Sequence, residues 1–196
     1  MKRKQLKFTA YGLIIVLIAA LLVITASCSC GTKATTTSSG AVSGGVSTTK
    51  SAVGAVTTTQ YTNPLYGLKV PSQWTVNSAN AKDITVNSSS ATAYVRILTS
   101  IGSVASLDSY LSSCVSLLKL EFPAYAEQSR SKITVNGLPA YSLNVTFTKS
   151  GVATKAIMYV IVKGTQGYCA VGMATPTEWN KYSADLTAIL NSVKPN

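Results

Sequence analysis

Four cysteines carry the most distinctive chemistry in this chain, because a thiol can be acylated, oxidised to a disulfide or bound to a metal. Two of them lie in the stretch ITASCSC, residues 24–30, where a long apolar run gives way to a polar tract. The other two, Cys114 and Cys169, lie far downstream in segments with regular apolar spacing. A C-x-C metal or redox site is not favoured at Cys28 and Cys30, since a polar tract offers nothing to organise further ligands.

The segment before Cys28 has the order of a secretion signal. It starts with basic residues, and residues 8–27 carry no charge, with the densest apolar part over residues 13–24. A short apolar core after a basic start is typical of a signal peptide. The small residues that then precede Cys28 resemble the bacterial lipobox, although Thr25 stands where leucine is most common. The resemblance implies that the Cys28 thiol receives a diacylglyceryl group and that signal peptidase II cuts after Ser27.

Lipidation of Cys28 predicts a protein held on the outer side of the cell membrane. Each buried methylene contributes about 0.8 kcal/mol, and two acyl chains anchor a protein stably. An uncleaved signal anchor is one alternative to a lipoprotein signal peptide over residues 1–27, because about twenty uncharged residues can span a roughly 30 Å hydrocarbon core. An ordinarily cleaved, secreted form is the other. Both alternatives place the rest of the chain outside, since the basic start stays cytoplasmic. Cys30 is an alternative acceptor of the lipid.

The composition changes twice after the leader. Residues 28–60 are almost entirely Gly, Ala, Ser, Thr and Val, and they contain no aromatic residue before Tyr61. Such a segment has too few large apolar side chains to offset its conformational entropy. We therefore expect a lipidated flexible tether over residues 28–60 and one globular domain over residues 61–196.

The residue types limit the chemistry of that domain. The chain has no histidine, which removes imidazole bases and every histidine-containing metal site. Its six acidic residues show no paired spacing, so a carboxylate pair depends on tertiary folding. The formal net charge is +11, but four basic residues precede the apolar run, and no basic cluster with interleaved aromatics follows. We expect no catalytic residue, cofactor, metal or nucleic-acid partner.

Two segments of the domain have helical periodicity. In residues 106–123 the apolar positions form one stripe, with Ser106 as the predicted N-cap and Pro123 after the end. In residues 175–193 the sequence begins with Thr-Pro-Thr-Glu, which predicts a capping box between Thr175 and Glu178 with proline at the first helical position.

The other regular segments have the composition of β-strands. A hairpin is predicted at Asn136-Gly137, the strongest short signal for a tight turn between strands. Residues 155–163 are apolar on both faces, which predicts a central strand. The predicted strand segments lie within residues 66–76, 83–86, 93–100, 131–135, 138–147, 155–163 and 168–174. The fold class is therefore α+β, an antiparallel sheet covered by helices.

Cys114 and Cys169 are candidates for a disulfide. Cys114 lies on the apolar stripe of the first predicted helix, and Cys169 shares a strand face with Val171 and Met173. Outside the cytoplasm two buried cysteines of one domain can be linked if their Cα atoms come within roughly 7 Å. The bond would close a long loop and contribute on the order of 4 kcal/mol. Two unlinked core thiols are the alternative, because free cysteine is among the most buried residue types.

The domain resembles the PsbP-like family over nearly all of residues 61–194. The matching residues are Tyr66-Gly67-Leu68 with Pro71 and Trp74, Asn136-Gly137 with Pro139-Ala140-Tyr141, Gly167-Tyr168, and Pro176, Trp179, Tyr182 and Asn191-Ser192-Val193-Lys194, with valine where the family often has phenylalanine. The resemblance implies an α/β/α sandwich, known from an extrinsic photosystem protein and from bacterial lipoproteins. It also implies a non-enzymatic assembly, stabilising or binding subunit with no shared set of catalytic residues.

Together these features predict a lipoprotein whose non-catalytic domain binds or stabilises a protein or cell-envelope partner. A small solute-binding lipoprotein associated with transport is one alternative, and it predicts a concave apolar pocket with a few converging polar groups. A serine hydrolase is another, and it requires serine, lysine and oxyanion donors to converge.

Overall fold

The structure is a computed structural model that describes residues 47–49 and 57–196. The predicted signal peptide, Cys28 and Cys30 lie outside the described residues, as does most of the predicted tether. The short strand β1 (Ser47–Thr49) falls inside the segment predicted as tether, and β2 (Thr58–Thr62) starts just before the predicted domain boundary. The boundaries at residues 28 and 61 remain predictions.

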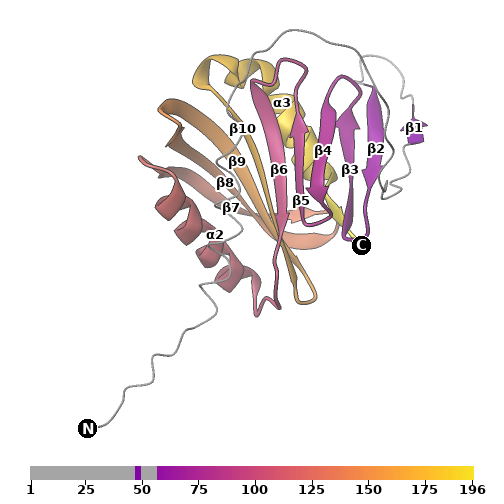
Figure 1. Ribbon diagram of the computed structural model, residues 1–196. Coiled ribbons are helices and arrows are strands. Elements are labelled where there is room, and N and C mark those ends of the chain that lie inside the picture. The colour runs from indigo at the N-terminus through magenta and orange to yellow at the C-terminus, as the bar shows by residue number, and fades with distance from the viewer. Residues whose placement is uncertain (1–46, 50–56) are drawn as a thin grey trace. The chain divides into compact units, whose positions relative to one another are not determined.

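An antiparallel sheet of seven strands forms the centre of the domain, in the order β4-β5-β6-β10-β9-β8-β7 (Figure 1). Its strands are β4 (Thr75–Asn80), β5 (Asp83–Asn87), β6 (Ala93–Thr99), β7 (Ala126–Val135), β8 (Leu138–Lys149), β9 (Val152–Lys163) and β10 (Gln166–Ala174). Strand β9 lies between β8 and β10, so the prediction of a central strand is confirmed. The middle position of the seven belongs to β10.

A second, smaller sheet has the order β1-β2-β3-β11, with β3 (Tyr66–Pro71) paired to β2 and to the two-residue strand β11 (Lys194–Pro195). The sequence predicted one sheet, and its segment 66–76 is divided between the two. Strand β3 belongs to the smaller sheet and β4 to the larger one, because the chain turns at residues 72–74.

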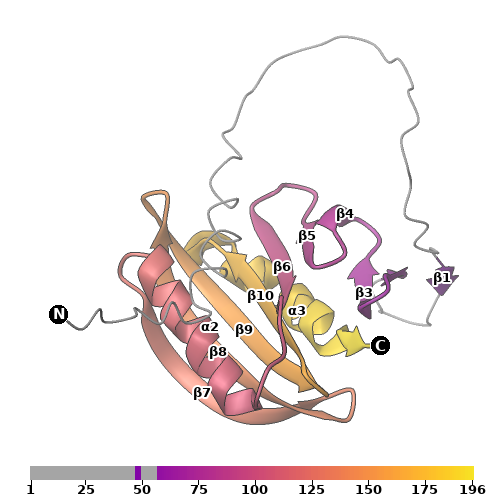
Figure 2. The same ribbon diagram turned by 60° about the horizontal axis from the view of Figure 1, so that its bottom comes forward.

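Two helices cover opposite faces of the seven-stranded sheet. Figure 1 and Figure 2 show α2 (Leu107–Glu121) on one face and α3 (Pro176–Ser192) on the other. The predicted first helix is confirmed, and Ser106 caps it through a reciprocal hydrogen-bonded arrangement with Ser109. The fold is α+β, as predicted. Within the described residues, neither helix is long and apolar enough to cross a membrane.

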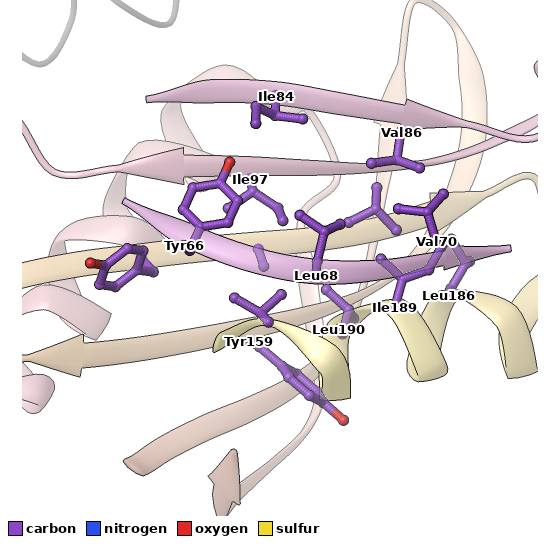
Figure 3. Packing of buried hydrophobic residues seen from close by; sticks show 14 of the residues in the cluster. Tyr66, Leu68, Val70, Ile84, Val86, Ile97, Tyr159, Leu186, Ile189 and Leu190 are labelled. Carbon is purple, nitrogen blue, oxygen red and sulfur yellow. The ribbon is translucent and has the colours of Figure 1, made fainter. Parts of the chain in front are cut away.

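The larger core lies on the α3 side of the sheet. Figure 3 shows β3 packed between α3 and the strands β5 and β6, with apolar side chains converging from all of them. Its fully buried members include Leu68, Val70, Ile84, Ile97, Leu186, Ile189 and Leu190. Burying a leucine or isoleucine side chain completely stabilises a fold by about 1.5–3 kcal/mol. This core therefore fixes β3 and α3 against the larger sheet.

A second core lies under α2. The helix buries Leu111 and Val115, and Phe122 just past its end stacks on Phe147 of β8 with ring centroids 4.4 Å apart. The sheet contributes alternate residues that point away from α3, among them Leu143, Val145, Met158, Val160, Cys169 and Val171. The stripe predicted from the periodicity of residues 106–123 is the face that this core buries.

The predicted turn at Asn136-Gly137 is confirmed, with φ angles of 48° and 82° that suit a tight β-hairpin. The predicted capping box of the second helix is wrong. Thr175 is the N-cap and Pro176 follows it, but the Thr175 side chain caps no backbone N–H group. Glu178 instead accepts a hydrogen bond from the hydroxyl of Thr92 at 3.2 Å. A tertiary partner has replaced the local one.

The close approach of α2 to β10 depends on Gly167. A Cβ atom added to Gly167 would lie 2.6–2.8 Å from three ring carbons of Tyr110, the residue one turn before Cys114. Ring carbons of a half-buried tyrosine cannot withdraw as the end of a flexible chain can. A side chain at position 167 would therefore push α2 away from the sheet.

We expect Gly167→Ala to destabilise the domain by about 2 kcal/mol, the usual effect of overpacking a core. Chemical denaturation measures this change. Gly102→Ala is the matched control, because an added Cβ there meets no atom within 4 Å, and we expect a change below about 0.5 kcal/mol. If the clash is the cause, Tyr110→Leu recovers part of the loss in the double variant. Equal effects of the two alanine substitutions would contradict this account of the packing.

Candidate binding site around Lys149 and Tyr94

Charged and phenolic side chains gather on the α2 face of β6. Tyr94 and Arg96 alternate with the buried residues Val95 and Ile97, so they point to the opposite face from the larger core. Arg96 donates two hydrogen bonds to the carboxylate of Asp83 on β5, at 2.8 and 2.6 Å. Both side chains are largely shielded from solvent, with 11% and 15% exposed. This is a bidentate ion pair at a diagonal position between neighbouring strands.

Lys149 reaches the same region from the end of β8. Its ammonium donates a hydrogen bond to the Tyr94 hydroxyl and lies 4.5 Å from the centre of the Tyr94 ring. Strands β10 and β9 separate β6 from β8 in the sheet. At strand spacings near 4.8 Å, β6 and β8 are about 14 Å apart, so only two long side chains can bridge them. The attraction of a cation to an aromatic ring supports the contact.

Burial changes the proton affinity of these groups. It raises the pKa of Tyr94 to about 12, so the phenol is neutral at physiological pH. Burial also lowers the pKa of Lys149 below its ordinary value, and the positive charge of Arg96 lowers it further, while Glu121 at the end of α2 acts in the opposite direction. The pKa of Glu121 is itself raised by burial. The Lys149 ammonium is thus held in a poorly solvated position.

A pocket of about 150 Å³ opens beside Lys149 and Tyr94. Side chains from the turn before β6, from four strands and from the start of α3 line it, namely Thr92, Tyr94, Lys149, Val152, Thr154, Met173, Ala174 and Thr175. An ammonium has three donors, and Tyr94 accepts from one of them. Among the described residues, no carboxylate forms a salt bridge with Lys149. The arrangement can therefore accept a small anionic group, with threonine hydroxyls close by.

Sequence reasoning did not find this site. Its residues come from β5, β6, α2, the β8–β9 hairpin, the end of β10 and the start of α3, and none is spaced from another as in a known motif. The one local signal is Arg96 inside an otherwise uncharged strand, since a charge at that position needs a partner across the sheet. Within the described part of the chain, no three Cys, Asp or Glu side chains form a group that could hold a metal ion.

The structure places Cys114 and Cys169 on facing sides of the α2 core. Both are buried and both are free thiols. Hydrogen bonding with the Cys169 thiol, followed by burial, raises the pKa of Cys114 well above its ordinary value. The disulfide remains a prediction. Cys28, the predicted lipidation site, lies outside the described residues.

We expect Asp83→Asn to destabilise the domain by about 3 kcal/mol, because it leaves the shielded Arg96 guanidinium without its counter-charge. Thermal and urea denaturation at neutral pH measure the loss. The chain provides a matched control in Glu127→Gln, which breaks an Arg130 pair of the same bidentate geometry whose side chains are 43% and 27% exposed. We expect that change to cost no more than about 0.5 kcal/mol. A control as costly as Asp83→Asn would show that burial is not the deciding factor.

The comparisons with known proteins concern the fold. No family model and no curated protein matches the chain. Among solved structures, cyanobacterial PsbP from Synechocystis sp. PCC 6803 is similar with a TM-score of 0.55 and 10% identity, over 76% of this chain and 98% of that one. A Pseudomonas aeruginosa protein of unknown function has a TM-score of 0.47 and 14% identity, over 71% of this chain and 97% of that one. LpqN of Mycobacterium tuberculosis, described as involved in cell envelope biogenesis, has a TM-score of 0.45 and 16% identity, over 66% and 82%. The chain therefore has a PsbP-like fold.

Proposed function

We propose that this protein is a lipid-anchored module on the outer side of the cell membrane that binds a protein or cell-envelope partner without catalysing a reaction. The anchor is the diacylglyceryl group on Cys28, and residues after it form the tether. The PsbP-like domain is the binding part. Two observations support the proposal. The succession of basic, apolar and small residues before Cys28 supports the anchor, and the chemistry of the pocket beside Lys149 supports the binding role.

The observation that carries the binding role is the state of Lys149. Its ammonium is poorly solvated and donates a hydrogen bond to a neutral phenol. Because folding has already removed water from this cation, an anionic group of a partner can bind it at a lower cost in desolvation free energy. Val152, at 51% exposure, lies at the rim of the same pocket. A carboxylate side chain or a chain terminus of the partner fits the size of the pocket.

The two alternatives fit the geometry less well. Pockets for small organic ligands usually measure roughly 300–1,000 Å³, and this pocket is about half the lower limit. A serine hydrolase needs its lysine beside a serine hydroxyl. The half-buried lysine of this domain donates to a tyrosine instead.

The anchor is tested with Cys28→Ser in the full chain, expressed in a bacterial host with its own leader. We expect this variant to lose the lipid, to keep its leader and to show a correspondingly changed mass. Extraction with detergent and alkali distinguishes a lipid anchor from a retained leader. Cys30→Ser is the matched control and should behave as the parent. A Cys28→Ser protein of unchanged mass and unchanged membrane fractionation contradicts lipidation at this residue.

The binding site is tested with a photo-crosslinking residue in place of Val152. We expect a defined crosslinked species in intact cells, and we expect Lys149→Met to reduce its yield about tenfold, because the cation is lost while the apolar stem remains. Lys132→Met is the matched control, since Lys132 lies 5.8 Å from the ring centre of Tyr141 on the strand pair β7–β8.

The same crosslinking residue at Ile101, which is 39% exposed and outside the pocket, checks the position. Identical crosslinks from residues 101 and 152, or equal losses with both lysine substitutions, contradict the proposed site. Thermal denaturation of each variant confirms that the loss does not come from unfolding.

A further inference from the structure

The contact of Tyr110 with Gly167 sets the positions of two cysteines. Cys114 follows Tyr110 by four residues, which is a rise of about 6 Å along an α-helix. Cys169 follows Gly167 by two residues, which is about 6.6 Å along a β-strand and returns to the same face. Because the two advances nearly match, a helix that runs along the strand and touches it at Gly167 places Cys114 over Cys169.

Burial and contact agree with this placement. Each cysteine is 7% exposed, and both belong to the core between α2 and the sheet. The Tyr110 ring lies beside the pair, and its hydroxyl interacts with the Cys114 thiol. The two thiols also lie within hydrogen-bonding reach of each other. A phenol cannot form a disulfide, so each thiol has the other as its partner for oxidation.

We propose that Cys114 and Cys169 are joined by a disulfide bond in the exported protein. The proposal rests on the proposed location outside the cytoplasm, where such bonds persist. One thiolate attacks the disulfide of an oxidoreductase and forms a mixed disulfide, and the second thiolate displaces the oxidoreductase. The two thiols lose two protons and two electrons, and the oxidoreductase is reduced to its dithiol.

The surroundings of the pair decide when the bond forms. The thiolate is the reactive species in disulfide exchange. In the folded domain the pKa of Cys114 is raised, and Tyr110 and the packing of α2 close off the pair. The bond therefore forms while the chain folds, before α2 seats on β10, and it resists reductants afterwards. It links the helix covalently to the middle strand of the sheet.

The test uses the full chain with Cys28→Ser and Cys30→Ser, so that two cysteines remain. The reduced, unfolded protein is refolded in an oxidising glutathione buffer and alkylated in denaturant, with and without prior reduction. We expect one crosslinked peptide pair that contains residues 114 and 169, and no alkylation without reduction. Alkylation of both thiols after refolding overturns the proposal.

Two further measurements separate the bond from the location. Reduction of the refolded protein should lower its midpoint of thermal unfolding by about 10 °C. The same reductant should not change the midpoint of the double variant that carries Cys114→Ala and Cys169→Ala. An unchanged midpoint overturns the bond as a structural link. The parent chain, expressed with its own leader, should also be recovered oxidised. A bond that forms on refolding but is absent from cells overturns the proposed export and leaves the geometry of the pair supported.

Discussion

Strand β10 is covered on both faces, and the small residues along it decide how closely each helix can approach. Gly167 receives the ring of Tyr110 from α2, and Gly172 lies under Leu186 of α3, whose Cβ would be 3.2 Å from an added methyl group. Alternate residues of one strand thus serve two separate cores. Because β10 also pairs with β6 and β9, a shift of either helix is transmitted to the strands on both sides. The positions of the candidate site and of the cysteine pair depend on this arrangement.

The two faces of the sheet are used differently. On the α3 side, strands β3, β5 and β6 and helix α3 form an apolar core that holds the smaller sheet against the larger one. On the other side, α2 packs on β9 and β10, while the same face of β6 carries Tyr94 and Arg96. Polar groups so poorly solvated must be paired, and the Asp83 carboxylate and the Tyr94 hydroxyl are the partners that the fold supplies. A cation held by a phenol remains available to an anion, whereas one held by a carboxylate does not.

In the proposed function, the N-terminal segment attaches the protein to the membrane and the folded domain binds the partner. Attachment to the membrane requires only an accessible cysteine and a cleavable leader, and both are properties of a short linear segment. Binding of a partner requires side chains from several elements at fixed separations, which only a folded domain provides. A PsbP-like fold does not itself specify the partner, because one fold serves many binding surfaces. In the proposed function, the residues around Lys149 supply the binding chemistry that the fold alone does not specify.

The sequence predicted the individual helices, strands and turns well, because hydrophobic periodicity and turn residues determine local structure over a few positions. The helix over residues 106–123, the hairpin at Asn136-Gly137 and the central strand over residues 155–163 are all confirmed. The resemblance in turn and core residues also predicted the PsbP-like fold, because these residues fix how the elements pack. The sequence alone likewise predicts the leader and Cys28, which the described residues do not test. Tertiary structure decided the second sheet, the contact of Glu178 with Thr92 in place of a capping box, and the meeting of Lys149 with Tyr94. Each of these depends on the pairing order of strands distant in sequence, which is set by the burial of whole sheet faces and not by any local pattern.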